Sequence, residues 1–385
     1  MEFLQTLENI RAEEASVQRL FGGDGVRVRD IRKSPRYVQS LTEAAVFVAD
    51  IYKGTRPVSQ LREALTTSDF PQLFGDILDR QVLASYQETP RTWQNYCKRS
   101  VLRDFRQAKR FRIDGGEGVL EEVAEQAPYP EAAITDDVYT IQVKKFGRRM
   151  PFSWESMIND DLQALRDIPE RFGRAARRSE EKTATQLFVD ANGPHASLYT
   201  GGNANIVTSN PVLSLPALQT AFTVLAAMRD SDGEPIAIDM VELVVPPALE
   251  VTAQNILNAT EVWLNENGGA SNQQVHTVNW IRSKLRLSVN PYIPIVASSS
   301  NGNTSWFLFA NPNNGRPALE MAFLRGHEEP EIFMKTSNAQ RIGGGMTDPM
   351  DGDFDTDSLQ YKVRHVLGGA RLDPKMTVAS SGAGS

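Results

Sequence analysis

The feature that most constrains the fold of this chain is a double reversal of charge along one segment. Residues 98–112 carry seven basic side chains and one acidic side chain, whereas residues 114–137 carry eight acidic side chains and neither lysine nor arginine. Basic side chains return between residues 144 and 149. Residues 139–144 alternate apolar and polar side chains, as in a β-strand, and the glycines of residues 115–118 indicate a turn. The pattern predicts a long two-stranded hairpin, basic where it leaves the body and acidic towards its tip.

The charge pattern by itself leaves two interpretations open. A solvated hairpin would use its charges only to stay soluble, and a docking hairpin would place them against another surface. Over the whole chain, 41 basic residues against 48 acidic residues give a net charge of −7. No overall field therefore draws the protein to nucleic acid or to an anionic membrane, and any contact made by charge must be local.

Apolar periodicity predicts an α+β body around this hairpin. Residues 2–20 are typical of an amphipathic helix, but residues 1–67 as a whole show no core of their own and are interpreted as an arm. Start signals at residues 68–71, and again at Asp167 and Pro169, predict helices, the second of about 20 residues. Further helices are expected at residues 217–228 and 248–259, and strands at residues 241–245, 285–289, 293–297, 305–309, 318–325 and 359–368.

No catalytic or metal-binding constellation emerges from the sequence. The four histidines are far apart and Cys97 is the single cysteine, so a zinc site of the Cys/His type is not expected. Neither a nucleophile elbow nor a phosphate-binding glycine loop occurs. The acidic residues 348–357 begin like a calcium loop, yet Thr356 and Lys362 stand where a glycine and a glutamate are required. An exposed loop is favoured there over a weak divalent-cation site, and we expect no cofactor and no catalytic residue.

Several segments match one known family in order along the chain. Residues 139–162 (YTIQVKKFGRRMPFSWESMINDDL) lead into residues 168–176 (IPERFGRAA). Further matches are residues 67–71 (TSDFP), 243–250 (LVVPPALE) and 361–373 (YKVRHVLGGARLD). Together these segments resemble the major capsid proteins of tailed bacteriophages with the Hong Kong 97-like fold, in the branch that includes the head subunit of phage Mu. The resemblance covers roughly residues 65–375, and no single motif in it is a chemical signature.

The resemblance implies a Hong Kong 97-like capsid fold of the α+β class. The implied parts are an N-terminal arm at residues 1–67, a peripheral domain at residues 68–105 and 150–212 with a spine helix at about residues 167–190, an extended loop at residues 106–149, an axial domain at residues 213–324, and peripheral-domain strands with a C-terminal tail at residues 325–385. It also implies a subunit that assembles through hexamers and pentamers into an icosahedral shell around double-stranded DNA.

In such a shell, the acidic part of the hairpin is expected to lie on a basic surface of a neighbouring subunit. The candidate inter-subunit contacts are the acidic residues Asp114, Glu117, Glu121, Glu122, Glu125 and Glu131, and the basic residues Arg148, Arg149, Arg171, Arg174, Arg177 and Arg178. Exposed ion pairs contribute only about 0.2–1 kcal/mol each, so the network is expected to set register more than strength. Glu180 and Glu181, which follow these arginines, are interpreted as part of a solvated or paired helix face.

The resemblance also implies the partners of the chain. They are further copies of the chain, packaged double-stranded DNA bound without sequence specificity, a portal at one vertex, and a separate scaffold or decoration protein. No membrane partner is expected, because no run of about 18 apolar residues occurs and the first residues do not form a signal peptide. Assembly is expected in the cytoplasm of the bacterial host, and the final location is the virion capsid. The alternatives are an encapsulin-like compartment, which shares the fold but packages enzymes, and a hydrolase.

Overall fold

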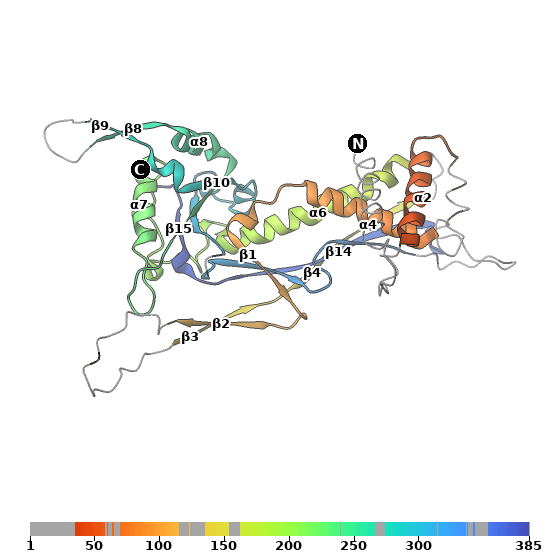
Figure 1. Ribbon diagram of the computed structural model, residues 1–385, viewed down its shortest axis with the longest axis horizontal. Coiled ribbons are helices and arrows are strands. Elements are labelled where there is room, and N and C mark those ends of the chain that lie inside the picture. The colour runs from red at the N-terminus through yellow and green to blue at the C-terminus, as the bar shows by residue number, and fades with distance from the viewer. Residues whose placement is uncertain are drawn as a thin grey trace. The chain divides into compact units, whose positions relative to one another are not determined.

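The computed structural model shows a mixed α+β chain whose elements separate into two compact units (Figure 1). The first unit is formed within Met1–Pro90, Lys145–Arg178 and Gly326–Val366, and the second within Arg91–Lys144, Ser179–Arg325 and Leu367–Ser385. The described residues are 35–57, 60, 64, 70–114, 123, 135–153, 162–238, 240–265, 274–313, 315–335, 337, 342 and 353–384. The α+β class predicted from the sequence is confirmed.

The first unit is built on helices α2 (Pro35–Tyr52) and α4 (Phe70–Glu88) and on the first part of α6 (Leu162–Phe188). In α2, Leu41, Ala45 and Val48 follow the helical period and are buried. They form one core cluster with Ile77 of α4 and with Phe172 of α6. The helix expected at residues 2–20 lies outside the described residues.

Helix α6 begins at Leu162, so the prediction that it starts near Asp167 is wrong. Pro169 lies inside the helix, where it donates no backbone hydrogen bond. Ile168 and Phe172 on either side of it are both buried in the core cluster of the first unit. This packing offsets the cost of the missing hydrogen bond, which a sequence signal for a helix start does not take into account.

Strand β14 (Ser358–Arg371) is the longest strand among the described residues and contributes to both units. Its first half pairs with β13 (Glu331–Met334), and β4 (Lys144–Ser153) also pairs with β14. Its second half pairs with β12 (Leu319–Leu324), which in turn pairs in parallel with β1 (Cys97–Leu102). The N–H of Ile332 in β13 donates to Oδ1 of Asp79 in α4 at 3.2 Å. The Asp79 side chain of α4 therefore accepts a hydrogen bond from a backbone N–H of the edge strand β13.

The second unit contains a sheet in the order β10-β7-β11-β15. Its strands are β7 (Val241–Val245), β10 (Leu285–Val289), β11 (Trp306–Ala310) and β15 (Thr377–Ser380), and helices α7 (Leu215–Ala226) and α8 (Glu250–Asn258) pack with them. These bounds confirm the strands and helices predicted for this part. The strand predicted at residues 293–297 is wrong, because Ile293–Val296 form the short helix α9 with Pro294 in its first turn.

An aromatic cluster fills the core between this sheet and the end of α6. Phe188 is fully buried and lies edge-on to Tyr96, Phe307 and Phe309, at centroid distances of 5.3, 4.9 and 5.2 Å. Tyr96 stacks on Phe309 at 5.2 Å. The end of α6 is therefore held by ring contacts that come from strand β11 and from the segment before β1.

The two-stranded hairpin predicted from the charge pattern is present in the described residues. Strands β2 (Ala108–Asp114) and β3 (Thr135–Ile141) pair antiparallel, with Arg110 opposite Tyr139 and Phe111 opposite Val138. A second hairpin joins β8 (Glu261–Asn265) to β9 (Gln274–Val278). The remaining short elements are strands β5 (Val189–Asp190) and β6 (Gly193–Pro194) and 3-10 turns at Trp93–Asn95, Gly201–Asn203, Pro247–Leu249, Trp280–Ser283, Ser300–Asn303 and Pro374–Met376.

Candidate functional site

The root of the β2–β3 hairpin is tied to the sheet by one ion pair. Arg110 of β2 donates from Nε at 3.1 Å and from Nη2 at 2.9 Å to Oε1 of Glu320 in β12. The Glu320 side chain is 4% exposed, whereas that of Arg110 is 37% exposed. The Nε2 group of Gln142, just after β3, also donates to the carbonyl of Phe105 at 2.9 Å. These contacts fix how the hairpin leaves the body of the second unit.

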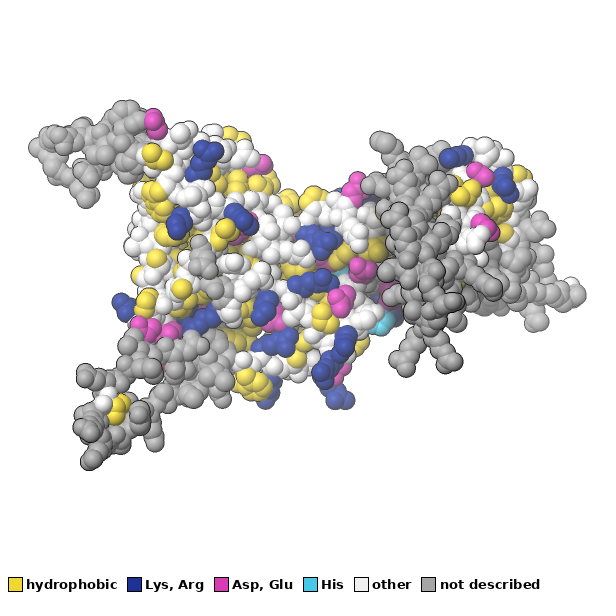
Figure 2. Space-filling model, in the orientation of Figure 1, with side chains coloured by type: hydrophobic (Ala, Val, Ile, Leu, Met, Phe, Trp, Pro, Cys, Tyr) yellow, Lys and Arg dark blue, Asp and Glu magenta, His cyan; other side chains and the backbone are white. Residues whose placement is uncertain are grey.

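The other face of the hairpin is open to solvent and partly apolar. Phe111 and Val138 lie directly opposite each other and are 65% and 50% exposed. Lys109 on the same face is also exposed. In the space-filling view, lysine and arginine side chains gather near the root of the hairpin (Figure 2). An exposed cross-strand apolar pair among basic side chains is typical of a surface that another chain covers.

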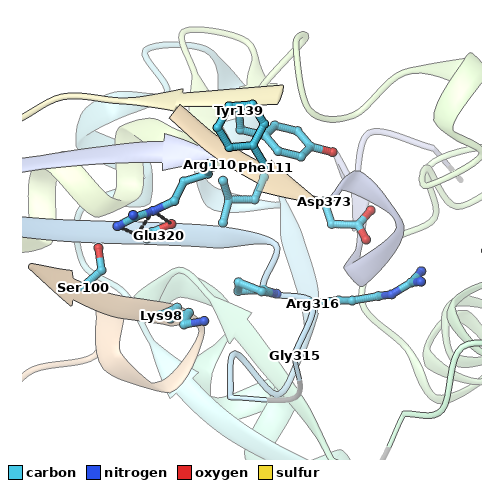
Figure 3. A pocket seen from close by; sticks show the side chains of 11 residues that line it. Lys98, Ser100, Arg110, Phe111, Tyr139, Gly315, Arg316, Glu320 and Asp373 are labelled. Atoms are coloured by element: carbon cyan, nitrogen blue, oxygen red, sulfur yellow. Dashed lines mark hydrogen bonds and ion pairs between the residues drawn. The ribbon is translucent and has the colours of Figure 1, made fainter. Parts of the chain in front are cut away.

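A cavity of about 440 Å³ lies beneath the root of the hairpin in the second unit (Figure 3). Its walls come from β1, β2, β3 and β12, from the loop before β12 and from the residues after β14. The lining residues are Lys98, Ser100, Arg110, Phe111, Tyr139, Gly315, Arg316, Pro317, Glu320, Leu372 and Asp373. The cavity therefore combines basic side chains with aromatic and aliphatic walls, a composition that no motif in the sequence indicated.

The four arginines of α6 that were predicted as inter-subunit contacts differ in their exposure to solvent. Arg171 and Arg178 are exposed, and Arg174 forms an ion pair with Glu170 at 3.8 Å. Arg177 is fully buried, donates to the carbonyl of Tyr86 at 2.8 and 3.1 Å, and places its guanidinium 3.7 Å from the centre of the Tyr86 ring. The expectation for Arg177 is therefore corrected, because its side chain is used inside the first unit.

The other predicted contact residues are only partly covered by the structure. Arg148 and Arg149 are exposed on β4, and Arg149 donates to Oε1 of Gln360 at 3.3 Å. Asp114 is the last residue of β2. The remaining acidic candidates lie outside the described residues: Glu117, Glu121, Glu122, Glu125 and Glu131.

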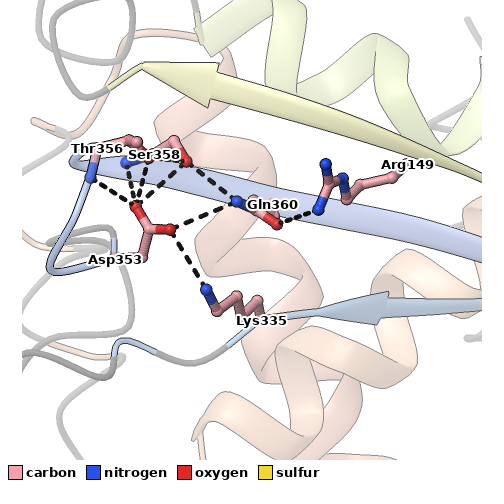
Figure 4. Close-up of polar contacts among 6 residues, drawn as sticks. All are labelled: Arg149, Lys335, Asp353, Thr356, Ser358 and Gln360. Atoms are coloured by element: carbon pink, nitrogen blue, oxygen red, sulfur yellow. Dashed lines mark hydrogen bonds and ion pairs between the residues drawn. The ribbon is translucent and has the colours of Figure 1, made fainter.

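The carboxylate of Asp353, in the acidic run at residues 348–357, is satisfied by protein donors (Figure 4). Its Oδ1 accepts from the hydroxyl of Thr356 at 2.6 Å and from the N–H of Ser358 at 3.1 Å, and its Oδ2 accepts from Nζ of Lys335 at 3.3 Å. These hydrogen bonds, that of Thr356 first, hold the pKa of Asp353 below its ordinary value. Asp353 therefore organises a turn, and the described residues contain no group of three or more side chains placed to hold a metal ion.

Glu180 and Glu181 are buried, so of the two expected alternatives, a solvated or a paired helix face, the solvated one is wrong. Glu181 accepts hydrogen bonds from the N–H of Thr92 at 2.6 Å and from its hydroxyl at 2.7 Å, and Glu180 accepts from Nε1 of Trp93 at 3.1 Å. Burial raises the pKa of Glu181 above its ordinary value, against the lowering effect of the Thr92 hydrogen bonds. The two carboxylates hold the segment before β1 against α6.

We expect Glu181→Gln to change how stability depends on pH. A carboxyl group whose pKa is raised by folding stabilises the folded state most at low pH, and this contribution is lost as pH rises from about 4.5 towards the raised value. Urea unfolding between pH 4 and 8 should therefore show a smaller loss of stability with rising pH in the variant than in the natural chain. An identical pH profile for the two chains would contradict this assignment.

Among the described residues, no helix is long and apolar enough to cross a bilayer.

Comparison with known proteins gives a family match over most of the chain. A family model described as phage capsid protein matches residues 137–380. A search of curated proteins finds no match. Among solved structures, the chain is similar to a chain from Gordonia phage Cozz, with 14% identity, a TM-score of 0.42, and coverage of 74% of this chain and 83% of that one. It is also similar to a capsid chain of the native GTA particle, with 10% identity, a TM-score of 0.44, and coverage of 76% and 90%. A third similar chain comes from the cyanophage Pam1 capsid, with 12% identity, a TM-score of 0.43, and coverage of 72% of this chain and 86% of that one.

Proposed function

This chain belongs to the phage capsid protein family, and from that membership we propose that it is the major capsid protein of a tailed bacteriophage. Membership makes it a structural protein of the virion capsid and not an enzyme. In the proposal, copies of the chain assemble through hexamers and pentamers into an icosahedral shell that encloses double-stranded DNA. Assembly takes place in the cytoplasm of the bacterial host.

The proposed subunit has the Hong Kong 97-like fold. In this proposal, the β2–β3 hairpin belongs to the extended loop and α6 is the spine helix. The sheet β10-β7-β11-β15, with α7 and α8, belongs to the axial domain. The placement in the branch of the phage Mu head subunit rests on the sequence resemblance of residues 139–162, 168–176, 67–71, 243–250 and 361–373.

The observation that carries the assembly proposal is the anchored hairpin with an uncovered outer face. The ion pair of Arg110 with buried Glu320 fixes the root of the hairpin, while Phe111 and Val138 remain exposed on its outer face. A fixed projection with exposed apolar side chains buries them when another subunit covers it. The acidic residues 114–137 then meet a basic surface of that neighbour, for which the exposed Arg171 and Arg178 of α6 are candidates together with Arg174.

The proposed partners other than the chain itself are the packaged DNA, a portal at one vertex, and a scaffold or decoration protein. The net charge of −7 suits a wall that encloses DNA without tight binding, because tight binding needs many basic contacts to phosphates. DNA is therefore proposed to be confined by the shell and bound without sequence specificity.

Electron microscopy of the purified, expressed protein tests the proposed function. Closed particles, or rings of five and six subunits, are the expected result. Particles isolated from infected cells should contain DNA that resists nuclease until the shell is opened. Particles that contain protein cargo and exclude DNA would instead support the encapsulin-like alternative, and a monomer with hydrolytic turnover would overturn the proposal.

Reversing the exposed charges of the spine helix should weaken assembly. We expect the double variant Arg171→Glu/Arg178→Glu to lower particle yield several-fold, most strongly at low salt, because each exposed pair is weak but the pairs recur in every subunit. Lys182→Glu is the matched control, since Lys182 is also exposed on α6 but is not among the candidate contacts. Equal yields for the double variant and the natural chain at low salt would exclude this surface.

A further inference from the structure

The lining of the cavity beneath the hairpin contains three basic side chains, Lys98, Arg110 and Arg316, and two carboxylates, Glu320 and Asp373. Lys98 of β1 is exposed and has no ion-pair partner among the described residues. The hydroxyl oxygen of Ser100, two residues further along the same strand, is buried without a hydrogen-bond partner in the described part of the chain. Glu320 is already paired with Arg110. The uncompensated groups at this wall therefore favour a ligand with an anionic oxygen.

The remaining walls favour a ligand that also carries apolar groups. Tyr139 from the hairpin (Figure 3) lines the same cavity as Pro317 and Leu372. A free inorganic anion would leave these apolar walls in contact with water. A peptide that carries both carboxylates and aliphatic side chains would satisfy both kinds of wall at once.

The chain itself contains such a peptide. Residues 117–125 have the sequence EGVLEEVAE, with four glutamates and four aliphatic side chains and no basic residue. The pairing of β2 with β3 continues past Phe111 to Asp114 and Thr135, and residues 117–125 follow Asp114 along the chain. A second copy of the chain is therefore the source that the topology favours.

We propose that the cavity beneath the hairpin root receives residues 117–125 of a second copy of this chain, with a glutamate of that copy at Lys98 and Ser100. The inference rests on the proposed assembly and assigns a receptor to the first half of the acidic stretch. Only the second half of the acidic stretch, from Glu131 to Asp137, is then assigned to the arginines of α6.

A charge exchange tests this contact. Lys98→Glu should lower particle yield about tenfold or more, because it places a carboxylate opposite the incoming glutamates. Adding Glu121→Lys/Glu122→Lys to the same chain should restore most of the yield. Lys284→Glu is the control, since Lys284 is exposed in the second unit but does not line the cavity. Absence of rescue, together with a normal particle yield for Lys284→Glu, would overturn the proposal.

A cross-link distinguishes a second copy from the chain's own loop. In the variant Lys98→Cys/Glu121→Cys, which uses the exposed position 98 of the cavity, oxidation of assembled particles should give disulfide-linked multimers on a non-reducing gel, and natural Cys97, which is buried, should not react. An intramolecular disulfide would overturn the assignment to a second copy. If Lys98→Glu instead lowered DNA binding and left particle yield unchanged, the cavity would be a phosphate site. Failure of the natural chain to form particles would count against the proposed function itself.

Discussion

Replacing Arg110 with alanine is expected to lower the free energy of unfolding by about 2–4 kcal/mol. The substitution leaves the carboxylate of Glu320, 4% exposed, without its ion-pair partner in the sheet. An uncompensated buried charge is costly, and because Arg110 is itself 37% exposed, the effect should stay below the upper limit for fully buried pairs. Urea unfolding of the unassembled subunit measures the change.

A double variant separates the cost of leaving Glu320 buried without a partner from the net contribution of the Arg110–Glu320 pair to stability. Arg110→Ala/Glu320→Ala should be more stable than Arg110→Ala alone, because it removes the buried carboxylate as well. Both variants should assemble poorly, since the root of the hairpin is no longer fixed. A destabilisation below about 0.5 kcal/mol for Arg110→Ala would show that this ion pair does not anchor the hairpin.

Replacing Phe188 with alanine is expected to cost about 3–5 kcal/mol of stability, the range for a fully buried phenylalanine. The Phe188 ring lies within 5.3 Å, centre to centre, of three other rings. Its removal leaves a cavity between the end of α6 and strand β11, because the surrounding structure relaxes only partly around a deleted side chain. Denaturant unfolding of the unassembled subunit is again the measurement.

A leucine variant provides the control for this prediction. Phe188→Leu keeps much of the buried volume but loses the edge-on ring contacts, so it should be clearly less destabilising than alanine. Equal losses for the two variants would mean that the ring contacts, and not the filled volume, dominate the stability of this cluster.

The sequence predicted the regular elements well where one physical signal decided the outcome. The strand at residues 241–245 is a short, mainly apolar run closed by two prolines, and the strand at residues 285–289 is a short run followed by Pro291; both are confirmed. The β2–β3 hairpin followed from charge and alternation. The segment at residues 293–297 failed, because its branched side chains indicated a strand while Pro294 favours the first turn of a helix.

The sequence predicted the candidate site less well, because the deciding partners are far away along the chain. Arg177 looks like its exposed neighbours in the sequence, yet its guanidinium is taken up by the carbonyl and ring of Tyr86. Glu181 likewise meets Thr92, and Arg110 meets Glu320. No periodicity encodes such pairings. The cavity beneath the hairpin was missed for the same reason, since its walls come from five separate stretches of the chain.

The position of β15 in its sheet has a consequence for the timing of synthesis. Strand β15 pairs with β11, and residues beyond it bond back to the loop before α7, as in the hydrogen bond from Gly384 N–H to the carbonyl of Asn210. Strands β7, β10 and β11 leave the ribosome well before β15 does, so the sheet of the second unit cannot be completed until residues 377–380 have emerged. A nascent chain therefore lacks the finished second unit until β15 has left the ribosome, and the inner edge of β11 stays unpaired until then.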